Sequence, residues 1–374
     1  MTSLSIIGCG FVADLYMRSL TTFPDINVTQ VYDRDADRLA EFSSYWNVPS
    51  VSSLETFFAS LSAGSVVVNL TNPSSHHDIN KACLSAGHHV YSEKPLAVRM
   101  DDAIELHELA QSKGLLLASA PCSALAQSAQ TLGKAIRDGV AGTPRLIYAE
   151  LDDGFVPQAP FDNWRSESGA LWPAKDEFEV GCTLEHAGYY LSWLIAWFGR
   201  VERVIAASAE VLPHKQPSGK GTPDFSTATL FFANGPVVRL TCSIVAPHDH
   251  QIRVIGDDGV LSLKKAWDNG ATVKFHRRFR VRRRLLENPI GRKIKLGKAT
   301  HPKVGRWGAA SMNFALGPVE MLDAIAQDRP CRLSGEFALH LNEVTLAIQN
   351  AGRDAGVQIM TTTCAPMEPM PWAL

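Results

Sequence analysis

Residues 4–33 read LSIIGCGFVADLYMRSLTTFPDINVTQVYD, which is an apolar run, a glycine-rich turn, an amphipathic segment and a second β-rich run. Val12, Leu15, Tyr16 and Leu20 recur at the spacing of one helical face, which predicts a helix between two strands. Parallel strands need a crossover of this length, because a tight hairpin joins only antiparallel strands. The stretch therefore predicts the first strand, helix and strand of a parallel sheet.

The same alternation continues to about residue 121. Gly87 ends a predicted helix at 79–86, and another apolar run follows. The predicted strands of this region are 4–7, 28–32, 66–70, 89–91 and 115–118. Apolar strands that alternate with helices are typical of a doubly wound α/β sheet. We therefore predict a Rossmann domain with a parallel sheet over residues 1–121.

A different rhythm begins after residue 121. Asn234-Gly235 and Asp258-Gly259 are hairpin turn sequences, which predict antiparallel neighbours. The predicted helices are 126–137 and 184–198, and the predicted strands are 145–151, 227–232, 237–245, 251–255 and 260–263. These features predict an α+β domain with a large, mainly antiparallel open sheet over residues 122–374. It would end in an extended Pro-rich tail from Ala365.

The composition excludes several classes of protein. Charged residues make up 20% of the chain and the formal net charge is -2, so no overall field favours nucleic acid or an anionic membrane. The seven cysteines are scattered without a C-x-x-C pair, which argues against a disulfide framework or a zinc knuckle. No transmembrane stretch or signal peptide is recognisable, so we expect a cytoplasmic protein.

The glycine-rich turn has the chemistry of a dinucleotide site. Gly8 permits a tight bend, Gly10 lets the backbone approach a pyrophosphate, and Ala13 packs the helix on the strand. Phe11 and Val12 begin the helix, whose N-terminal amides and dipole favour a negative group. A glycine pattern alone is weak evidence, but here it lies between a strand and a helix, as the site requires.

Asp33 ends the second predicted strand. A carboxylate there can accept hydrogen bonds from the adenosine ribose hydroxyls and repel a 2′-phosphate, which predicts NAD in preference to NADP. Arg34 follows directly and can pair with a phosphate, which weakens this preference. The alternative for Asp33 is a solvated loop carboxylate.

Four further segments resemble the Gfo/Idh/MocA oxidoreductases, the family of glucose-fructose oxidoreductase and inositol dehydrogenase. In chain order they are TNPSSH at 71–76, AGHHV at 86–90, EKPLA at 93–97 and residues 181–193. The resemblance implies a Rossmann domain, then an α/β domain whose open sheet often serves oligomerisation, here a dimer or tetramer. It also implies hydride transfer between a nicotinamide and a sugar, cyclitol or related polyol, and it leaves the substrate open.

The resemblance also implies roles for single residues. Lys94 matches the active-site lysine of the family, and Tyr190 falls where some members carry a tyrosine acid/base instead of histidine. His186 stands where aspartate is usual; a neutral imidazole offers one donor and one acceptor, so His186 can bind substrate, relay a proton, or do neither. The residues implied on the cofactor side are Thr71, Asn72, His76, Glu93, Lys94 and Arg165.

The spacing and position of these residues support the same roles independently of the resemblance. His186 and Tyr190 are four apart and project from one side of a helix. Lys94 follows a strand at the carboxyl edge of the sheet, where open α/β folds bind ligands. An ammonium there would favour tyrosinate at Tyr190, whose reference pKa of about 10 is high for a base. For Trp193 and Trp197 on the same stripe, packing under a sheet is the favoured interpretation.

A Gly- and Pro-punctuated loop, residues 164–179, precedes this helix. Trp172 lies in it beside several carboxylates. Tryptophan can cover the apolar face of a sugar, which makes Trp172 a candidate for substrate binding, and an ordinary solvated loop is an equally good interpretation.

Two histidines are candidates for metal binding. His248 and His250 lie at the period of a strand and face one way if the strand continues. A metal site would need at least one more convergent ligand and a hydrogen-bond partner behind it. Neither is visible in the sequence, so we predict no metal.

Residues 274–306 form a basic segment. Thirteen lysines and arginines stand there against one acid, Glu287. A phosphate, an acidic glycan, an anionic membrane or an acidic subunit would be attracted, but a solvated hairpin or loop insertion is favoured over any one of these.

Together these features predict reversible NAD-dependent oxidation of a secondary alcohol on a sugar, cyclitol or nucleotide-sugar. Tyr190 would take the hydroxyl proton while Lys94 steadies the oxygen. The alternatives are a redox-neutral lyase or epimerase that keeps its NAD, and a non-catalytic regulator that senses nicotinamide.

Overall fold

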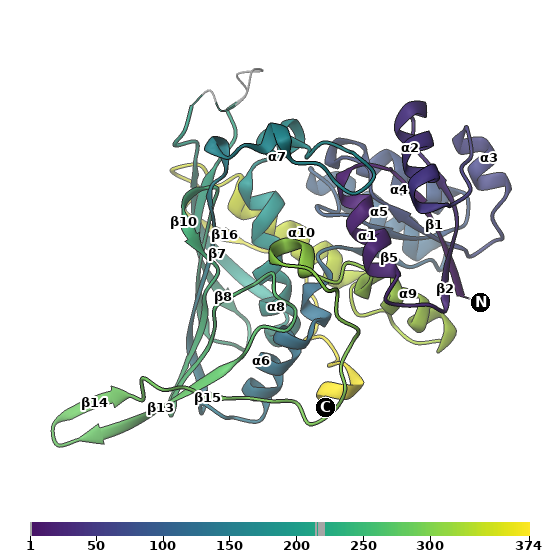
Figure 1. The fold of residues 1–374 in the computed structure, drawn as a ribbon. Coiled ribbons are helices and arrows are strands. Elements are labelled where there is room, and N and C mark those ends of the chain that lie inside the picture. The colour runs from purple at the N-terminus through teal and green to yellow at the C-terminus, as the bar shows by residue number, and fades with distance from the viewer. Residues whose placement is uncertain (1, 214, 216–220) are drawn as a thin grey trace. The chain divides into compact units, whose positions relative to one another are not determined.

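The computed structural model describes residues 2–213, 215 and 221–374, which fold as two compact units (Figure 1). Unit 1 comprises Met1–Cys122, Ala159–Val180 and Asn313–Asn342, and unit 2 comprises Ser123–Gln158, Gly181–Met312 and Glu343–Leu374. The boundary predicted at residue 121 falls beside the end of the first segment of unit 1. Two later segments also belong to this unit.

A parallel sheet forms the centre of unit 1. Its strands are β1 (Thr2–Ile7), β2 (Ile26–Tyr32), β3 (Val66–Asn69), β4 (His89–Ser92) and β5 (Leu117–Ser119). They lie in the order β2-β1-β3-β4-β5, and every pairing is parallel. The predicted fold class and each predicted strand of this region are confirmed.

The register of this sheet aligns the ends of its middle strands. Ile7 pairs with Asn69, and Asn69 pairs with Ser92. The loops that follow β1, β3 and β4 therefore begin side by side at the carboxyl edge. The strand order reverses between β1 and β3, and such a switch point is where open α/β sheets bind ligands.

Helices cover both faces of this sheet. The helices of unit 1 are α1 (Phe11–Leu20), α2 (Ala36–Trp46), α3 (Leu54–Ala59), α4 (His76–Ser85), α5 (Met100–Ser112), α7 (Ala174–Val180) and α9 (Leu316–Ala326), with short turns η1 (Pro73–Ser75) and η4 (Phe161–Asn163). Val90 points to one face, into a core shared with Leu84 of α4 and Leu106 of α5. Tyr91 points to the other, where its ring contacts Tyr16 of α1.

The return of α9 to unit 1 was not visible in the sequence, which places all of 122–374 in the second domain. In the structure α9 packs on β3, β4 and β5. A Cβ on Gly317 would lie 2.2 Å from the hydroxyl of Tyr91, so only glycine permits this closeness. Such a contact depends on partners far apart in the chain, and neither partner carries a local signal for it.

A larger sheet forms unit 2. Its strands are β6 (Pro144–Phe155), β7 (Val201–Ala209), β8 (Phe225–Phe232), β9 (Val237–Ser243), β10 (Val245–Asp249), β11 (Ile252–Gly256), β12 (Gly259–Leu263), β13 (Lys274–Val281), β14 (Arg284–Glu287), β15 (Arg292–Lys293) and β16 (Val357–Ile359). The main order is β14-β13-β12-β11-β6-β9-β8-β7-β16, with β10 on β6 and β15 on β13. Only the β6–β9 pairing among those described is parallel. The predicted mainly antiparallel sheet and its two hairpins are confirmed.

One face of this sheet is covered by helices. On β8, Ser226 hydrogen-bonds Thr183 and Phe232 packs on Phe198, so the even-numbered positions of this strand point to the helices. Paired residues of neighbouring strands share a face, and through β9 these positions pair with Ala149 and Leu151 of β6, which therefore point to the same side. We call it the covered face. The other, open face exposes Ile205 and Val357, which pair across β7 and β16.

The helices of unit 2 include one departure from prediction. They are α6 (Gln127–Arg137), α8 (Gly188–Phe198) and the turns η3 (Val156–Gln158), η5 (Thr183–Ala187), η6 (Gly308–Ser311) and η7 (Pro371–Ala373), while η2 (Cys122–Leu125) and α10 (Glu336–Gln349) cross between the units. The sequence predicts one helix over 184–198, but η5 is a π-helical turn and α8 begins only at Gly188. The wider π turn changes the relative direction of side chains across it.

Two outlying segments of unit 2 also take definite positions. The first part of the basic segment forms the β13–β14 hairpin, in which Arg278 pairs with Glu287, as the favoured interpretation predicts (Figure 1). The C-terminal tail is extended but docked, because the carbonyl of Ala373 accepts a 2.6 Å hydrogen bond from Arg137. No helix among the described residues has the length and apolar character that a bilayer crossing needs.

Candidate active site

The turn after β1 places two loops in direct contact. Gly8 has a φ of +99°, and a Cβ on it would lie 2.5 Å from the carbonyl carbon of Leu70 and 2.7 Å from the amide nitrogen of Thr71. Its own amide donates a 2.8 Å hydrogen bond to the carbonyl oxygen of Tyr32. The position requires glycine on two grounds, the backbone angle and the lack of space.

Gly10 differs from Gly8 in both respects. It is the N-cap of α1 with an ordinary extended conformation, and a Cβ on it would meet no atom within 4 Å. Phe11 and Val12 open the helix, where backbone amides have no intrahelical acceptor. The open space beside Gly10 lies at the N-terminus of α1, where backbone amides and the positive end of the helix dipole suit a pyrophosphate.

The carboxylate of Asp33 stabilises this turn through hydrogen bonds. One carboxylate oxygen accepts a 2.7 Å hydrogen bond from the amide of Cys9, and the other accepts a 2.9 Å bond from the amide of Asp35. Asp33 is thus not merely a solvated loop carboxylate, and its oxygens retain lone pairs for another donor. Arg34 is exposed beside it.

Arg38 was not singled out by the sequence. Its Nε donates a 2.8 Å hydrogen bond to the carbonyl oxygen of Cys9 in the glycine turn, and its Nη1 donates to the carbonyl oxygen of Ser168 at 2.9 Å. The Ser168 hydroxyl in turn donates to Asp14 of α1 at 2.7 Å. The guanidinium is therefore committed to acceptors of the protein, and it ties residues 159–180 to the turn.

Arg165, predicted on the cofactor side, lies in this returning segment and so in the same unit as the glycine turn. It is exposed, and its guanidinium donates to the carbonyl oxygen of Gly169 at 3.2 Å. Trp172 packs edge-on against Trp164, with ring centres 5.2 Å apart, and also contacts Phe161. Its ring thus belongs to an aromatic cluster.

His76 links the loops after β3 and β4. The imidazole is fully buried, with Nδ1 2.7 Å from the carbonyl oxygen of Pro95 and Nε2 3.0 Å from that of Thr71. Burial lowers the pKa of His76, although both carbonyl contacts act to raise it. Its observed contacts position the Thr71 and Lys94 loops relative to each other.

Glu93 anchors the loop that carries Lys94. Its buried carboxylate accepts 2.7 Å and 2.9 Å hydrogen bonds from the hydroxyl of Tyr16 and the amide of Lys94. Burial and the nearby Glu93 charge raise the pKa of Tyr16 well above its usual value, so this tyrosine remains a donor. Lys94 itself is half-buried at the carboxyl edge, next to the loops of Gly8 and Thr71.

Asn72 lies on the same side of unit 1 as α7. It hydrogen-bonds Asp176 of that helix, and the charge of Arg34 also acts on this carboxylate. Burial is the largest effect and raises the pKa of Asp176, with Glu179 adding to it. The structure thus brings Asn72 to Asp176, which lies in the predicted loop of residues 164–179 and was not singled out in the sequence.

Tyr190 occupies the interior of unit 2. Its side chain is fully buried, its hydroxyl donates a 2.6 Å hydrogen bond to the carbonyl oxygen of His250, and its ring packs edge-on against Trp193. Burial, with a smaller effect of Asp249, raises the pKa of Tyr190 well above its usual value. This environment favours the neutral phenol over tyrosinate.

His186 lies in the π-helical turn η5 and is buried. Its ring centre is 5.9 Å from that of Trp267, which also contacts the ring of His250 at 4.5 Å. Burial, then His248 and His186, lower the pKa of His250 to about 3, so this imidazole is neutral. Trp193 is buried with its indole nitrogen donating to Ser123 at 2.9 Å, so the predicted packing role holds for it.

Comparison with known proteins agrees with both units. Residues 3–120 match the oxidoreductase family with an NAD-binding Rossmann fold, and residues 129–262 match the GFO/IDH/MocA C-terminal domain. The chain belongs to the GFO/IDH/MocA oxidoreductase family. It is an NAD(P)-dependent oxidoreductase, so the predicted family and enzyme class are confirmed.

Similar proteins of known identity span most of the chain. Trans-1,2-dihydrobenzene-1,2-diol dehydrogenase of Mus musculus is 25% identical over 266 residues, or 70% of this chain and 74% of that protein. The WlbA dehydrogenase of Bordetella pertussis, solved with NADH and UDP-GlcNAcA, matches with a TM-score of 0.72 at 17% identity and covers 96% of this chain and 99% of its own. The aldose-aldose oxidoreductase of Caulobacter crescentus matches with a TM-score of 0.73 at 16% identity and the same coverage.

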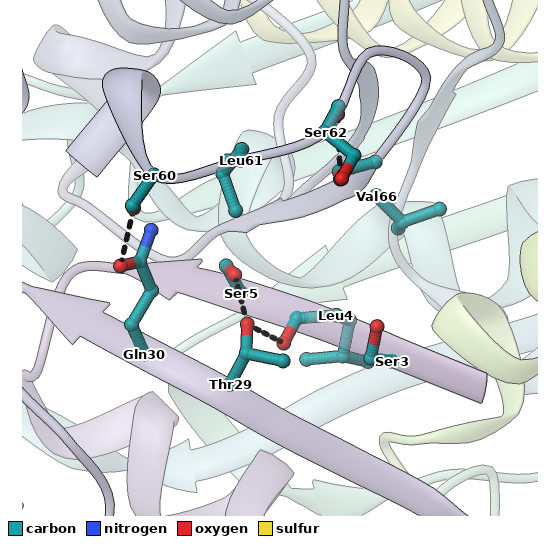
Figure 2. A pocket seen from close by; sticks show the side chains of 10 residues that line it. Ser3, Leu4, Ser5, Thr29, Gln30, Ser60, Leu61, Ser62 and Val66 are labelled. Carbon is teal, nitrogen blue, oxygen red and sulfur yellow. Dashed lines mark hydrogen bonds between the residues drawn. The ribbon is translucent and has the colours of Figure 1, made fainter. Parts of the chain in front are cut away.

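A pocket in unit 1 lies elsewhere. It is lined by residues of β1, β2, β3 and the turn after α3, among them Ser5, Thr29, Gln30 and Ser60 (Figure 2). These hydroxyl and amide groups pair with one another, as in the 2.7 Å contact between Ser5 and Thr29. The lining includes Ser3 near the start of β1, whereas Gly8 follows its end, so this pocket is distinct from the glycine turn of the family.

The two glycines of the turn allow a matched test. We expect Gly8→Ala to lower the free energy of unfolding by about 2 kcal/mol or more, because it strains the backbone and clashes with Leu70. Gly10→Ala should leave the free energy of unfolding within about 0.5 kcal/mol of wild type, yet weaken NAD(H) binding about tenfold or more. Urea unfolding and fluorescence titration measure the two quantities. Unchanged NAD(H) affinity in Gly10→Ala would mean that no ligand approaches this backbone.

Proposed function

We propose that this enzyme transfers hydride between NAD and a secondary alcohol or ketone of a sugar, cyclitol or nucleotide-sugar. The observation that carries the proposal is the convergence of the Gly8, Thr71 and Lys94 loops at one sheet edge. A WlbA dehydrogenase with NADH and a nucleotide-sugar, and an aldose-aldose oxidoreductase, share the fold. We assign cofactor binding to unit 1, which contains residues 1–121, and we propose that residues of unit 2 contribute to substrate binding.

Lys94 is proposed to hydrogen-bond the reacting oxygen. Its backbone is held by Glu93 and, through Pro95, by the buried His76. A fixed backbone at the carboxyl edge limits where the ammonium can reach, and such preorganisation favours a developing alkoxide over the neutral alcohol. The ammonium supplies charge and a donor without needing to lose its own proton.

His186 is proposed to exchange the proton with the substrate. A neutral imidazole has one donor and one acceptor, and π turns within helices occur frequently at functional sites. The sequence assigns the proton to Tyr190, but the hydroxyl of Tyr190 already donates to His250. We therefore propose that Tyr190 keeps its proton and holds the backbone at His250.

NAD is proposed in preference to NADP. The carboxylate of Asp33 is fixed by two backbone amides beside the glycine turn, where it would accept from ribose hydroxyls and repel a phosphate. Arg38 has its guanidinium on Cys9 and Ser168, which leaves the exposed Arg34 as the neighbouring cation for a phosphate. We also propose a cytoplasmic homo-oligomer, supported by the exposed apolar side chains on the open face of unit 2.

The enzymatic activity is tested by a screen of sugars, cyclitols and nucleotide-sugars with NAD and NADH, followed by nicotinamide absorbance. We expect stoichiometric NADH formation with one substrate class. Conversion of a substrate without net NADH formation would contradict the proposal and point to a redox-neutral reaction.

The cofactor preference is tested with Asp33→Asn, which removes the charge and keeps an oxygen acceptor. We expect wild type to bind NAD(H) more tightly than NADP(H), and the ratio to fall about tenfold or more in the variant, or about 1.4 kcal/mol. Asp35→Asn is the control, because Asp35 caps α2 through the amides of Asp37 and Arg38. Tighter binding of NADP(H) to wild type would contradict the proposal.

The proton-transfer residues are tested with the substrate found in the screen. His186→Ala and Lys94→Ala should each lower turnover about 100-fold or more, the usual scale for a positioned acid or base. Tyr190→Phe should keep turnover within about tenfold and lower the free energy of unfolding by about 1–3 kcal/mol, because the His250 carbonyl loses its donor. A 100-fold loss in Tyr190→Phe would restore Tyr190 as the acid/base. Lys113→Ala, an exposed lysine of unit 1, is the control.

A further inference from the structure

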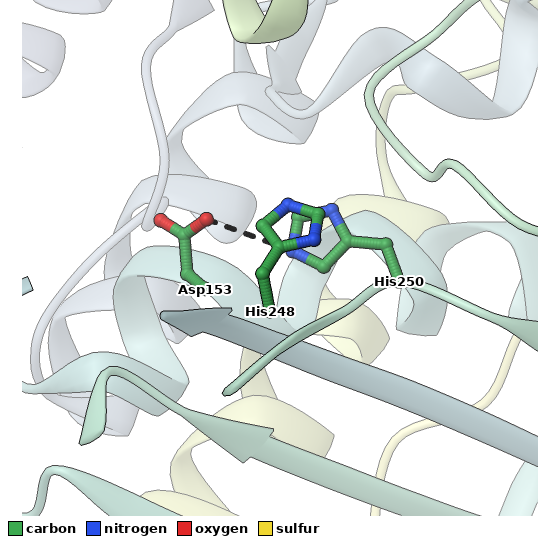
Figure 3. Close-up of side chains that lie close together, drawn as sticks. All are labelled: Asp153, His248 and His250. Atoms are coloured by element: carbon green, nitrogen blue, oxygen red, sulfur yellow. Dashed lines mark ion pairs between the residues drawn. The ribbon is translucent and has the colours of Figure 1, made fainter. Parts of the chain in front are cut away.

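A carboxylate and two imidazoles meet in unit 2, outside the residues proposed for hydride transfer (Figure 3). Asp153 lies near the end of β6, His248 lies in β10, and His250 follows that strand. One ligand atom from each lies within 4.8 Å of the others. The sequence predicts no metal for want of a third convergent ligand, and the fold supplies Asp153 from a distant strand.

An irregularity in the pairing of β10 with β6 turns the side chain of His248 toward Asp153 and His250. Ala246 pairs with Gly154, but Asp249 pairs with Asp152, so Pro247 and His248 together lie opposite Asp153. In a regular ladder His248 would pair with Asp152, and paired residues share a face of the sheet. The extra residue is a β-bulge, a feature that re-aims side chains and is frequent next to functional sites.

The three side chains are on the covered face of the sheet. Along β6, Ala149 and Leu151 point to this face, and Asp153 continues their alternation. His250 is 2% exposed, its ring lies against Trp267, and its carbonyl is held by Tyr190. One ligand is therefore fixed by packing, while the exposed His248 leaves the cluster accessible from solvent.

We propose that Asp153, His248 and His250 bind a divalent transition-metal ion, with Zn²⁺ as the best match. Two imidazoles and a carboxylate are a ligand set that Zn²⁺ uses, with metal-ligand distances of about 2.0–2.2 Å. Tetrahedral geometry at those distances places ligand atoms roughly 3.4 Å apart. The Nε2 of His250 is 3.7 Å from Oδ1 of Asp153, and the ligand atoms of all three residues lie within 4.8 Å of one another, so the side chains would move closer together to coordinate the ion.

Three protein ligands leave a coordination position open. In structural zinc sites protein side chains fill all four positions, whereas an open position accepts water or a ligand oxygen. Among the described residues, no other histidine, cysteine or carboxylate joins this cluster as a fourth member. The proposed ion would therefore be able to bind an oxygen of a small ligand as well as the protein.

The site is tested with the full-length protein, free of any polyhistidine tag and treated with a chelator, then titrated with Zn²⁺ alone by calorimetry. We expect one equivalent to bind with a Kd in the micromolar range or tighter, and Zn²⁺ to raise Tm. Co²⁺ should give the visible bands of a nitrogen- and oxygen-ligated ion without a thiolate charge-transfer band. The seven cysteines are buried, so a thiolate band would contradict the proposal.

Variants connect the binding to these residues. His248→Ala should weaken Zn²⁺ binding at least tenfold and abolish the Tm increase, while its own Tm without metal stays close to wild type because the side chain is exposed. Asp153→Asn should have a similar effect on binding. His77→Ala is the matched control, since His77 lies between the carboxylates of Asp78 and Glu105 in unit 1. Wild-type Zn²⁺ affinity in His248→Ala, or no saturable binding to the wild type, would overturn the proposal.

Discussion

The close approach of the Gly8 backbone to the loop after β3 is the constraint on which the carboxyl edge of unit 1 depends. A side chain at Gly8 would overlap Leu70 and Thr71, so the separation of the two loops is set by two backbones in contact. The strand order reverses between β1 and β3, and open α/β sheets bind ligands at such a switch point. The positions of Asp33 and Arg38 follow from this turn, since both hydrogen-bond its Cys9.

Buried polar side chains also fix the positions of the loops that follow β3 and β4. Asn69 accepts from the amide and hydroxyl of Thr71, His76 spans from Thr71 to Pro95, and Glu93 joins Tyr16 to Lys94. Leaving one such buried group unpaired costs about 1–3 kcal/mol, so the loops cannot shift independently at low cost. These hydrogen bonds fix the backbone of these loops at the carboxyl edge, and precise placement of a reactive group requires such a fixed backbone.

In unit 2 two of the histidines in our proposals lie where regular structure is interrupted. His186 lies in a π-helical turn, and His248 lies at a β-bulge. Elsewhere the covered face is built from apolar residues such as Ala149 and Leu151, which alternate regularly. Each interruption adds a residue to the local repeat and turns a side chain to a direction that the regular pattern would not give.

The sequence by itself determined the fold class, the parallel strands and the glycine turn. These rest on local rules, because a strand, a tight turn and a helix are each encoded by neighbouring residues. It also placed Asp33 and the Glu93–Lys94 segment just after strands β2 and β4, because their positions follow from where strands end. It mistook 184–198 for a uniform helix, because a π turn has no distinct local signal.

Only the tertiary structure decided which distant segments share a unit and which side chains meet. Residues 159–180 and 313–342 return to unit 1 through contacts such as Arg38 with Ser168 and Gly317 with Tyr91. The partner of the Tyr190 hydroxyl and the third member of the His248 and His250 cluster likewise come from register and packing. Side-chain convergence depends on how strands pair across the sheet, and a one-residue bulge changes it without changing the composition of either strand.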